Sequence, residues 1–159
     1  ILSWTLTPRE IARCFEADAP TPDVRIEAMT RCSKKGYPTS VNLVPLIPYG
    51  KWEDAYAELV DEVLARVPVR QIVLGGLCMK QRAFDLMRRR IGKENPVLRH
   101  LVQLDARGLE GRVIHRRGLF DNLLRRVFDI CKKKGLCRVV FDGRLGGTYA
   151  VCLGRWSLR

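Results

Sequence analysis

Long apolar runs are missing from this sequence, and so is any stretch typical of a signal peptide. No run approaches the ~18 apolar residues that a membrane-spanning helix requires, and the first residues lack a basic segment followed by an apolar one. We therefore expect a cytoplasmic protein with no membrane partner. With 159 residues, 47% of them hydrophobic, the chain is long enough to form one globular domain with a core.

Histidine is also scarce. His100 and His115 are the two histidines, and they lie in different segments with no arrangement of acidic residues that indicates a catalytic triad or a metal site. The glycine-rich stretch 143–148 lacks the Gly-Lys-Ser/Thr ending of a phosphate-binding loop. The catalytic residues therefore stay unknown at this stage.

Cysteines are present, but their spacing does not match a metal site. Cys131 and Cys137 are the closest pair and are separated by five residues, whereas zinc-binding pairs are separated by two to four. Their density is also below that of a small secreted domain built on disulfides. We expect reduced, structural thiols and no metal site at Cys14, Cys32, Cys78, Cys131, Cys137 and Cys152.

Acidic residues are scarce in the second half of the chain. Residues 1–80 contain 10 basic and 10 acidic side chains, whereas residues 81–159 contain 19 basic and 7 acidic ones, which accounts for the whole net charge of +12. Such clusters can neutralise phosphates and release counterions, which indicates binding to DNA or RNA. A solvated helix face is the alternative for each cluster. The candidates are Arg88, Arg89, Arg90, Arg116, Arg117, Arg125, Arg126, Lys132, Lys133 and Lys134.

Strand and helix signals alternate along the chain. We predict strands at 3–8, 41–47, 70–74 and 137–142, and helices at 8–15, 21–36, 52–67, 80–91 and 119–134. Such alternation predicts a parallel sheet, either closed into a barrel or open, with functional groups at the carboxyl ends of the strands.

Apolar patterns predict which residues are inside. The run 41–47 is typical of a strand buried on both faces, and the helix from residue 80 is expected to turn Ala83, Phe84, Met87 and Ile91 inward. Between residues 95 and 117 the pattern is too irregular to assign.

Short motifs along the first 95 residues resemble a known family. They are Trp4-Thr5-Leu6-Thr7-Pro8, Phe15-Glu16, Arg25-Ile26-Glu27-Ala28, Gly36-Tyr37-Pro38, Pro45-Leu46-Ile47-Pro48, Trp52 with Tyr56, and Leu74-Gly75-Gly76. In this order and spacing they look like the spore photoproduct lyase family of radical SAM proteins. The similarity is looser from residue 95 to Lys134.

The resemblance implies an α/β fold. Residues 1–95 would form the later half of a partial (β/α)6 radical SAM barrel, and residues 96–159 a helical, basic C-terminal extension of the same domain. The family uses a [4Fe-4S] cluster and S-adenosylmethionine to generate a 5′-deoxyadenosyl radical, and its founding members repair a thymine dimer in spore DNA. The resemblance thus implies both cofactors and DNA as the partner.

The same resemblance indicates where S-adenosylmethionine would bind. Thr5 falls where the family places a small hydroxyl residue near this cofactor, and several strand ends would face the same cavity. Glycine at a strand end lets a ligand approach the backbone closely. The residues implied are Thr5, Asn42, Pro45, Ile47, Gly75 and Gly76. For Thr5, Asn42 and the two glycines, packing and turn geometry in the barrel is the alternative.

One departure from the family is severe. The Cys-x3-Cys-x2-Cys loop that holds the family's cluster does not occur in this sequence. Because cysteine thiolates hold such clusters, the chain alone is expected to be unable to start the radical reaction. The chain begins at Ile1, inside a predicted strand and without a methionine. We therefore expect it to be the later part of a larger enzyme, with an upstream half or partner chain supplying the iron-sulfur site.

Three interpretations follow. The favoured one is the C-terminal portion of a radical SAM enzyme that acts on DNA and is incomplete alone. The second is a non-enzymatic nucleic-acid-binding or interaction module that retains the later half of the barrel, and the third is an inactive truncated remnant. A member of the same family with another substrate is also compatible, because a fold does not fix a function.

Overall fold

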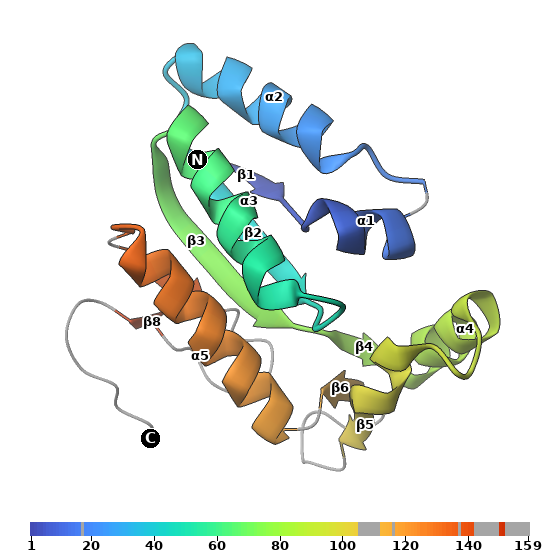
Figure 1. Ribbon diagram of the computed structural model, residues 1–159. Coiled ribbons are helices and arrows are strands. Elements are labelled where there is room, and N and C mark those ends of the chain that lie inside the picture. Colours follow the sequence, from blue (N-terminus) through green and yellow to red (C-terminus); the bar gives the residue numbers. More distant parts are fainter. Residues whose placement is uncertain (17, 105–111, 116, 137, 142–149, 152–159) are drawn as a thin grey trace.

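The computed structural model describes residues 1–16, 18–104, 112–115, 117–136, 138–141 and 150–151 (Figure 1). Its helices are α1 (Arg9–Phe15), α2 (Pro22–Lys34), α3 (Trp52–Arg66), α4 (Gln81–Ile91) and α5 (Arg117–Lys133), with a 3-10 helix, η1, at Pro96–His100. Its strands are β1 (Leu2–Thr5), β2 (Thr39–Leu46), β3 (Val69–Gly76), β4 (Cys78–Lys80), β5 (Leu101–Leu104), β6 (Arg112–His115), β7 (Val139–Phe141) and β8 (Ala150–Val151).

Local signals explain where helix α2 begins and ends. The side chain of Thr21 caps α2 by accepting a hydrogen bond from the Val24 N–H at 3.4 Å, and Pro22 occupies the first turn. The helix ends before Gly36, which has a φ of 86° that favours glycine. The predicted start of this helix is therefore confirmed, together with the chemical reason for it.

The main sheet has the strand order β1-β2-β3-β7-β8. The pairs β1–β2, β2–β3 and β3–β7 are parallel, and β8 runs antiparallel to β7. The predicted parallel sheet is thus confirmed. Since β1 and β8 lie at its two edges, the described strands form an open sheet, and the barrel implied by the resemblance stays a prediction.

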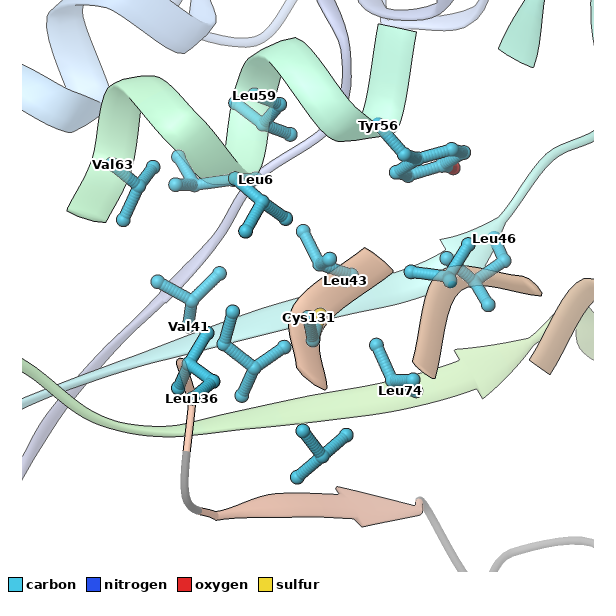
Figure 2. Close-up of a cluster of buried hydrophobic side chains, with 14 of the residues drawn as sticks. Leu6, Val41, Leu43, Leu46, Tyr56, Leu59, Val63, Leu74, Cys131 and Leu136 are labelled. Carbon is cyan, nitrogen blue, oxygen red and sulfur yellow. The ribbon is translucent and has the colours of Figure 1, made fainter. Parts of the chain in front are cut away.

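The main hydrophobic core lies on one side of this sheet (Figure 2). Helices α1, α2, α3 and α5 all contribute fully buried side chains to it, among them Ile11, Ile26, Leu59 and Val127. Core residues alternate along β2, where Val41 and Leu43 are buried whereas Asn42 and Val44 are half-buried. The prediction that this strand is buried on both faces is therefore wrong, because the helices pack against one face of the sheet.

A second, smaller sheet follows the main one. Its strands have the order β4-β6-β5, and both pairs are antiparallel. Leu77, Leu98, Leu101 and Val113 form a separate buried cluster, which the apolar side of α4 covers. These strands have three or four residues each, which is why the region between residues 95 and 117 shows no clear sequence pattern.

Two further expectations need correction in this part of the chain. Ala83 is exposed rather than inward, whereas Phe84, Met87 and Ile91 do pack against the second cluster. The region beyond residue 95 is not a helical extension with a single strand, because besides β7, within the strand predicted at 137–142, it contributes β5 and β6 to the second sheet. The division into 1–95 and 96–159 stays a prediction.

Candidate functional site

A row of residues crosses the main sheet, from the carboxyl end of β1 through the middle of β2, β3 and β7. Thr5 pairs with Asn42 in register, Asn42 with Val73, and Val73 with Val140. Their sequence neighbours Val41, Ile72 and Val139 are buried in the main core. Because successive side chains point to opposite faces of a sheet, these four belong to the face opposite the helices. We name this face, defined by Thr5, Asn42, Val73 and Val140, the open face.

The open face is polar on one side and apolar on the other. Thr5 is exposed, and Asn42, Val73 and Val140 are half-buried. Two residues earlier on β1 and β2, the hydroxyl groups of Ser3 and Ser40 form a hydrogen bond of 2.6 Å. The face therefore offers the Thr5 hydroxyl and the Asn42 amide beside aliphatic side chains from β3 and β7, whereas Ser40 is buried and paired with Ser3. Such a surface can hold a ligand that has both a polar and an apolar part.

Arg25 fixes the end of β1 from the neighbouring helix. Its guanidinium donates hydrogen bonds to the carbonyl oxygens of Thr5 at 3.1 Å and Pro20 at 2.8 Å, and it forms an ion pair with Glu16. The N–H of the next residue, Leu6, donates to the Asn42 carbonyl oxygen at 3.0 Å. The peptide group after Thr5 is thus held on both sides. Arg25 belongs to one of the resemblance motifs, but no sequence pattern indicates its contact with β1.

The other predicted cofactor residues differ in their placement. Gly75 and Gly76 end β3 and are buried, and Gly75 falls on the open-face side by alternation from Leu74. Pro45 is half-buried, near the end of β2, and follows a cis peptide bond. Of the predicted cofactor residues, Thr5 and Asn42 thus belong to the row that crosses the sheet. Gly75 lies on the same face, farther along β3 than Val73.

Ile47 is used by the fold itself. Its side chain belongs to the main core, its N–H donates a hydrogen bond to the buried Tyr56 hydroxyl at 3.0 Å, and its carbonyl oxygen accepts one from Tyr49. Burial raises the pKa of Tyr56, so this hydroxyl stays neutral. Packing in the main core therefore accounts for the position of the Ile47 side chain.

A cleft of about 630 Å³ lies in the helix layer, away from the open face. Its lining comes from α1, the start of α2 and one side of α3, and includes Arg9, Asp23 and Glu58. Arg9 forms ion pairs with Asp23 and, at 2.7 Å, with Glu62, so it joins three helices. The hydrogen bond from Arg9 holds the pKa of Asp23 below its usual range. Arg9, Asp23 and Glu62 thus link the three helices beside this cleft.

The described cysteines do not converge. Cys14 lies exposed on α1, Cys32 on α2, Cys78 at the start of β4, and Cys131 on the buried side of α5, and all four are free of disulfides. Within the described ranges, no group of three or more His, Cys, Asp or Glu side chains is arranged to hold a metal. These residues therefore do not fit a [4Fe-4S] cluster. Cys137 and Cys152 lie outside the described residues.

The basic residues of α5 lie in the helix layer beside the acidic helix α3. Arg125, Arg126, Lys132, Lys133 and Lys134 are exposed. Ion pairs connect Arg126 to α3 through Glu53, at 3.7 Å, and Lys134 through Asp61, at 2.6 Å.

These five residues therefore do not surround the open face. Of the adjacent candidates, Arg116 lies outside the described residues, and Arg117 is the first residue of α5.

The basic residues of α4 lie beside the second sheet, apart from α5 (Figure 1). Arg89 and Arg90 are exposed, and Arg90 forms an ion pair with Asp18 at 2.9 Å. Arg88 is half-buried and lies over the ring of Phe84, with 5.6 Å between the guanidinium carbon and the ring centroid. The structure thus divides the predicted nucleic-acid residues into two surfaces on different elements.

The described part of the chain is an α/β unit with a parallel sheet, helices on one face and a small antiparallel sheet after β3. No helix within the described residues is long and apolar enough to cross a membrane. Neither a model of a known protein family nor a curated protein matches the sequence.

Solved structures do match, and they are structures of spore photoproduct lyase. One is complexed with dinucleoside spore photoproduct and gives a TM-score of 0.68 at 16% identity. A mutant with the same compound gives 0.69 at 16% identity, and a mutant with bound AdoMet and the dinucleoside gives 0.68 at 15%. Each alignment covers 82% of this chain and 41% of the other.

This likeness confirms the resemblance at the level of the fold. The chain has the fold of part of spore photoproduct lyase and spans less than half of the length of the lyase chains that it matches. At 15 to 16% identity the comparison supports the arrangement of helices and strands, and the activity has to be argued separately.

Proposed function

We propose that this chain is the later part of a radical SAM enzyme of the spore photoproduct lyase type, acting on DNA in the cytoplasm. The observation that supports it most is the common fold over 82% of the chain, found in a protein whose structures contain AdoMet and a dinucleoside photoproduct. A segment outside this sequence would supply the cluster cysteines, because the described residues do not fit a [4Fe-4S] cluster.

In this proposal S-adenosylmethionine lies along the open face. The Thr5 hydroxyl and the Asn42 amide provide hydrogen-bonding groups, and Gly75 allows close approach to the backbone near the end of β3, whereas Gly76 pairs with the core residue Leu46. Pro45 borders the same strand ends. When bound with its cluster, S-adenosylmethionine supplies a carbon-centred radical. The role of this chain's residues is to hold and orient the cofactor.

Binding of S-adenosylmethionine to the chain can be tested residue by residue. The 18.2 kDa chain suits NMR, and titration should shift the backbone amides of Thr5, Asn42 and Val73 more than those of α3 or α5. An Asn42→Leu variant should lose these shifts, whereas the same change at the exposed Asn122 of α5 should leave them intact. Equal shifts in both variants, or shifts centred on the helix layer, would contradict the proposed site.

Cluster formation gives a second test. Reconstituted anaerobically with iron and sulfide and then reduced, the chain alone should give no [4Fe-4S] signal by electron paramagnetic resonance. A stoichiometric cluster whose signal changes on adding S-adenosylmethionine would refute this prediction, and would require a site among the chain's own cysteines.

A second candidate function is a nucleic-acid-binding module without radical chemistry. The net charge of +12 and the exposed basic residues of α4 and α5 favour it. Salt-sensitive DNA binding with no response to S-adenosylmethionine on the open face would support the module. An inactive remnant would show neither property.

A further inference from the structure

The two basic surfaces differ in the charges that surround them. Helix α3, which packs beside α5, contains five acidic residues and one basic one. Two of these acids form the ion pairs with Arg126 and Lys134. Since charges of opposite sign within a Debye length of about 8 to 10 Å offset one another, the potential over α5 is reduced by its neighbour.

Helix α4 packs against the short strands of the second sheet rather than against an acidic helix. It contains four arginines and a single acidic residue, Asp85, which accepts a hydrogen bond from Gln81 at 3.0 Å. An ion pair joins Arg90 to Asp18, before α2, and both of these side chains are mostly exposed, at 74% and 83%. An ion pair this exposed contributes little and can be exchanged for a phosphate contact.

The exposed basic residues of α4 share one side of the helix. Arg82, Arg89 and Arg90 are exposed, and the last two lie seven and eight positions after the first, which corresponds to about two turns. Lys93, just beyond the helix end at Gly92, is also exposed. Arg88 differs from them because it is half-buried against Phe84.

We propose that Arg82, Arg89, Arg90 and Lys93 form the surface through which this chain binds the phosphate backbone of nucleic acid, and that the basic residues of α5 do not. The inference rests on the nucleic-acid binding proposed above and names the surface that performs it. The helix is about 16 Å long at 1.5 Å per residue, a length over which duplex DNA presents about ten phosphate charges. Three cations on one side of such a helix, with a fourth just beyond its end, suit a sequence-independent backbone contact.

A membrane surface is the competing polyanion, and the packing of α4 argues against it. A helix that lies in a membrane interface needs a free apolar face. The apolar side chains of α4 that pack against the second cluster are Phe84, Met87 and Ile91. The large apolar side chain of α4 that is exposed is Leu86, at 56%. The surface is therefore suited to phosphates in water rather than to lipid chains.

Two matched triple variants test the inference. The first variant combines Arg82→Gln, Arg89→Gln and Arg90→Gln, and it removes three cations and one exposed ion pair from α4. The control, Lys132→Gln, Lys133→Gln and Lys134→Gln, removes three cations and one exposed ion pair from α5 and the residue after it. Both variants have the same net charge, so that an effect of total charge alone would be equal in the two.

Binding is measured by fluorescence anisotropy with a labelled duplex of about two helical turns, at salt concentrations from low to above physiological. At low salt the α4 variant should bind about tenfold or more weakly, and its slope of log K against log salt should fall by about 2.7, at about 0.9 for each phosphate that is no longer neutralised. The α5 variant should keep the wild-type slope to within about 1. Circular dichroism checks that each variant is folded. If the α4 triple variant is not folded, the single Arg82→Gln variant replaces it, with an expected slope change of about 0.9.

The outcomes separate the inference from the proposed function. If the α5 variant binds the duplex more weakly than the α4 variant, or if both are weakened equally, the inference is overturned while nucleic-acid binding stays intact. A wild-type chain that does not bind the duplex at low salt would overturn both. Tighter binding to vesicles containing anionic lipid than to the duplex, with that binding abolished in the α4 variant, would assign the surface to membranes and overturn the inference.

Discussion

Replacing Arg25 with methionine should destabilise the protein and loosen the end of β1. The change removes the guanidinium hydrogen bonds to the Thr5 and Pro20 carbonyl oxygens and the ion pair with Glu16. Methionine keeps a similar aliphatic length, so the loss is mainly polar.

The magnitude follows from the low exposure of the two charged side chains. A hydrogen bond to a charged group contributes about 1.5 to 3 kcal/mol, and the side chains of Arg25 and Glu16 are only 15% and 24% exposed. Water can replace part of the three interactions, so we expect a loss of about 2 to 3 kcal/mol in the free energy of unfolding rather than their sum. For a chain of this size that corresponds to a fall of about 5 to 10 °C in Tm.

Urea denaturation followed by circular dichroism measures the loss. The control is Arg31→Met on the same helix, because Arg31 is 70% exposed and its ion pair with Glu27 is long, at 3.9 Å. We expect this control to change stability by less than about 0.5 kcal/mol. Hydrogen exchange should in addition show faster exchange of the Leu6 amide in the Arg25 variant, since the end of β1 beside it is no longer held.

Two results would refute this reasoning. A loss below about 0.5 kcal/mol would mean that the guanidinium contacts contribute no more than a surface ion pair. A larger loss with unchanged exchange at Leu6 would mean that Arg25 stabilises the loop before α2 rather than the end of β1.

Three further predictions concern single side chains. Tyr56→Phe leaves a buried backbone N–H without its acceptor and should cost about 1 to 3 kcal/mol in urea denaturation, whereas Tyr37→Phe, at a 55% exposed ring, should cost less than about 0.5 kcal/mol. Because Arg9 lowers the pKa of Asp23 in the folded state, the pair stabilises the protein at neutral pH, and this contribution disappears as the pH falls below the folded pKa. Asp23→Asn should therefore lower the free energy of unfolding by up to about 1 kcal/mol at neutral pH. It should have no effect once the carboxyl is protonated in both the folded and the unfolded state. Burial raises the pKa of Cys131 to about 12, so among the described cysteines it should be the last to react with iodoacetamide in mildly alkaline buffer, as read by mass spectrometry.

Much of the main sheet and of the helices that cover it could be predicted because their sequence signals are local. Thr21 and Pro22 mark the start of α2, and the apolar stripe of α3, including Tyr56 and Leu59, indicates its buried side. The apolar runs at β2 and β3 are long enough to recognise as strands, and the short motifs carry the family resemblance that the fold comparison supports.

The rest depends on contacts between residues far apart in the sequence. Periodicity shows that Asn42 interrupts an apolar run, but only the register places it beside Thr5, 37 positions away. Ile47 resembles a cofactor residue by its motif, and its burial in the core becomes visible only with the position of α3. In the same way, nothing in the basic runs indicates that Lys134 pairs with Asp61 of an acidic helix, whereas α4 itself contains a single acidic residue, Asp85.

The separate cluster under α4 has a consequence for how the protein unfolds. Four buried residues form it, and no residue of α4 itself is fully buried, whereas the main core contains more than twenty buried side chains. Regions with little buried apolar surface open at a lower free energy than the rest of a protein. We therefore expect the second sheet and α4 to open at a lower free energy than the parallel sheet, although Met87 of α4 also contacts the main core. A polyanion bound to α4 would shift that local equilibrium toward the closed form, so occupancy of this surface can be read as slowed amide exchange in β4, β6 and α4.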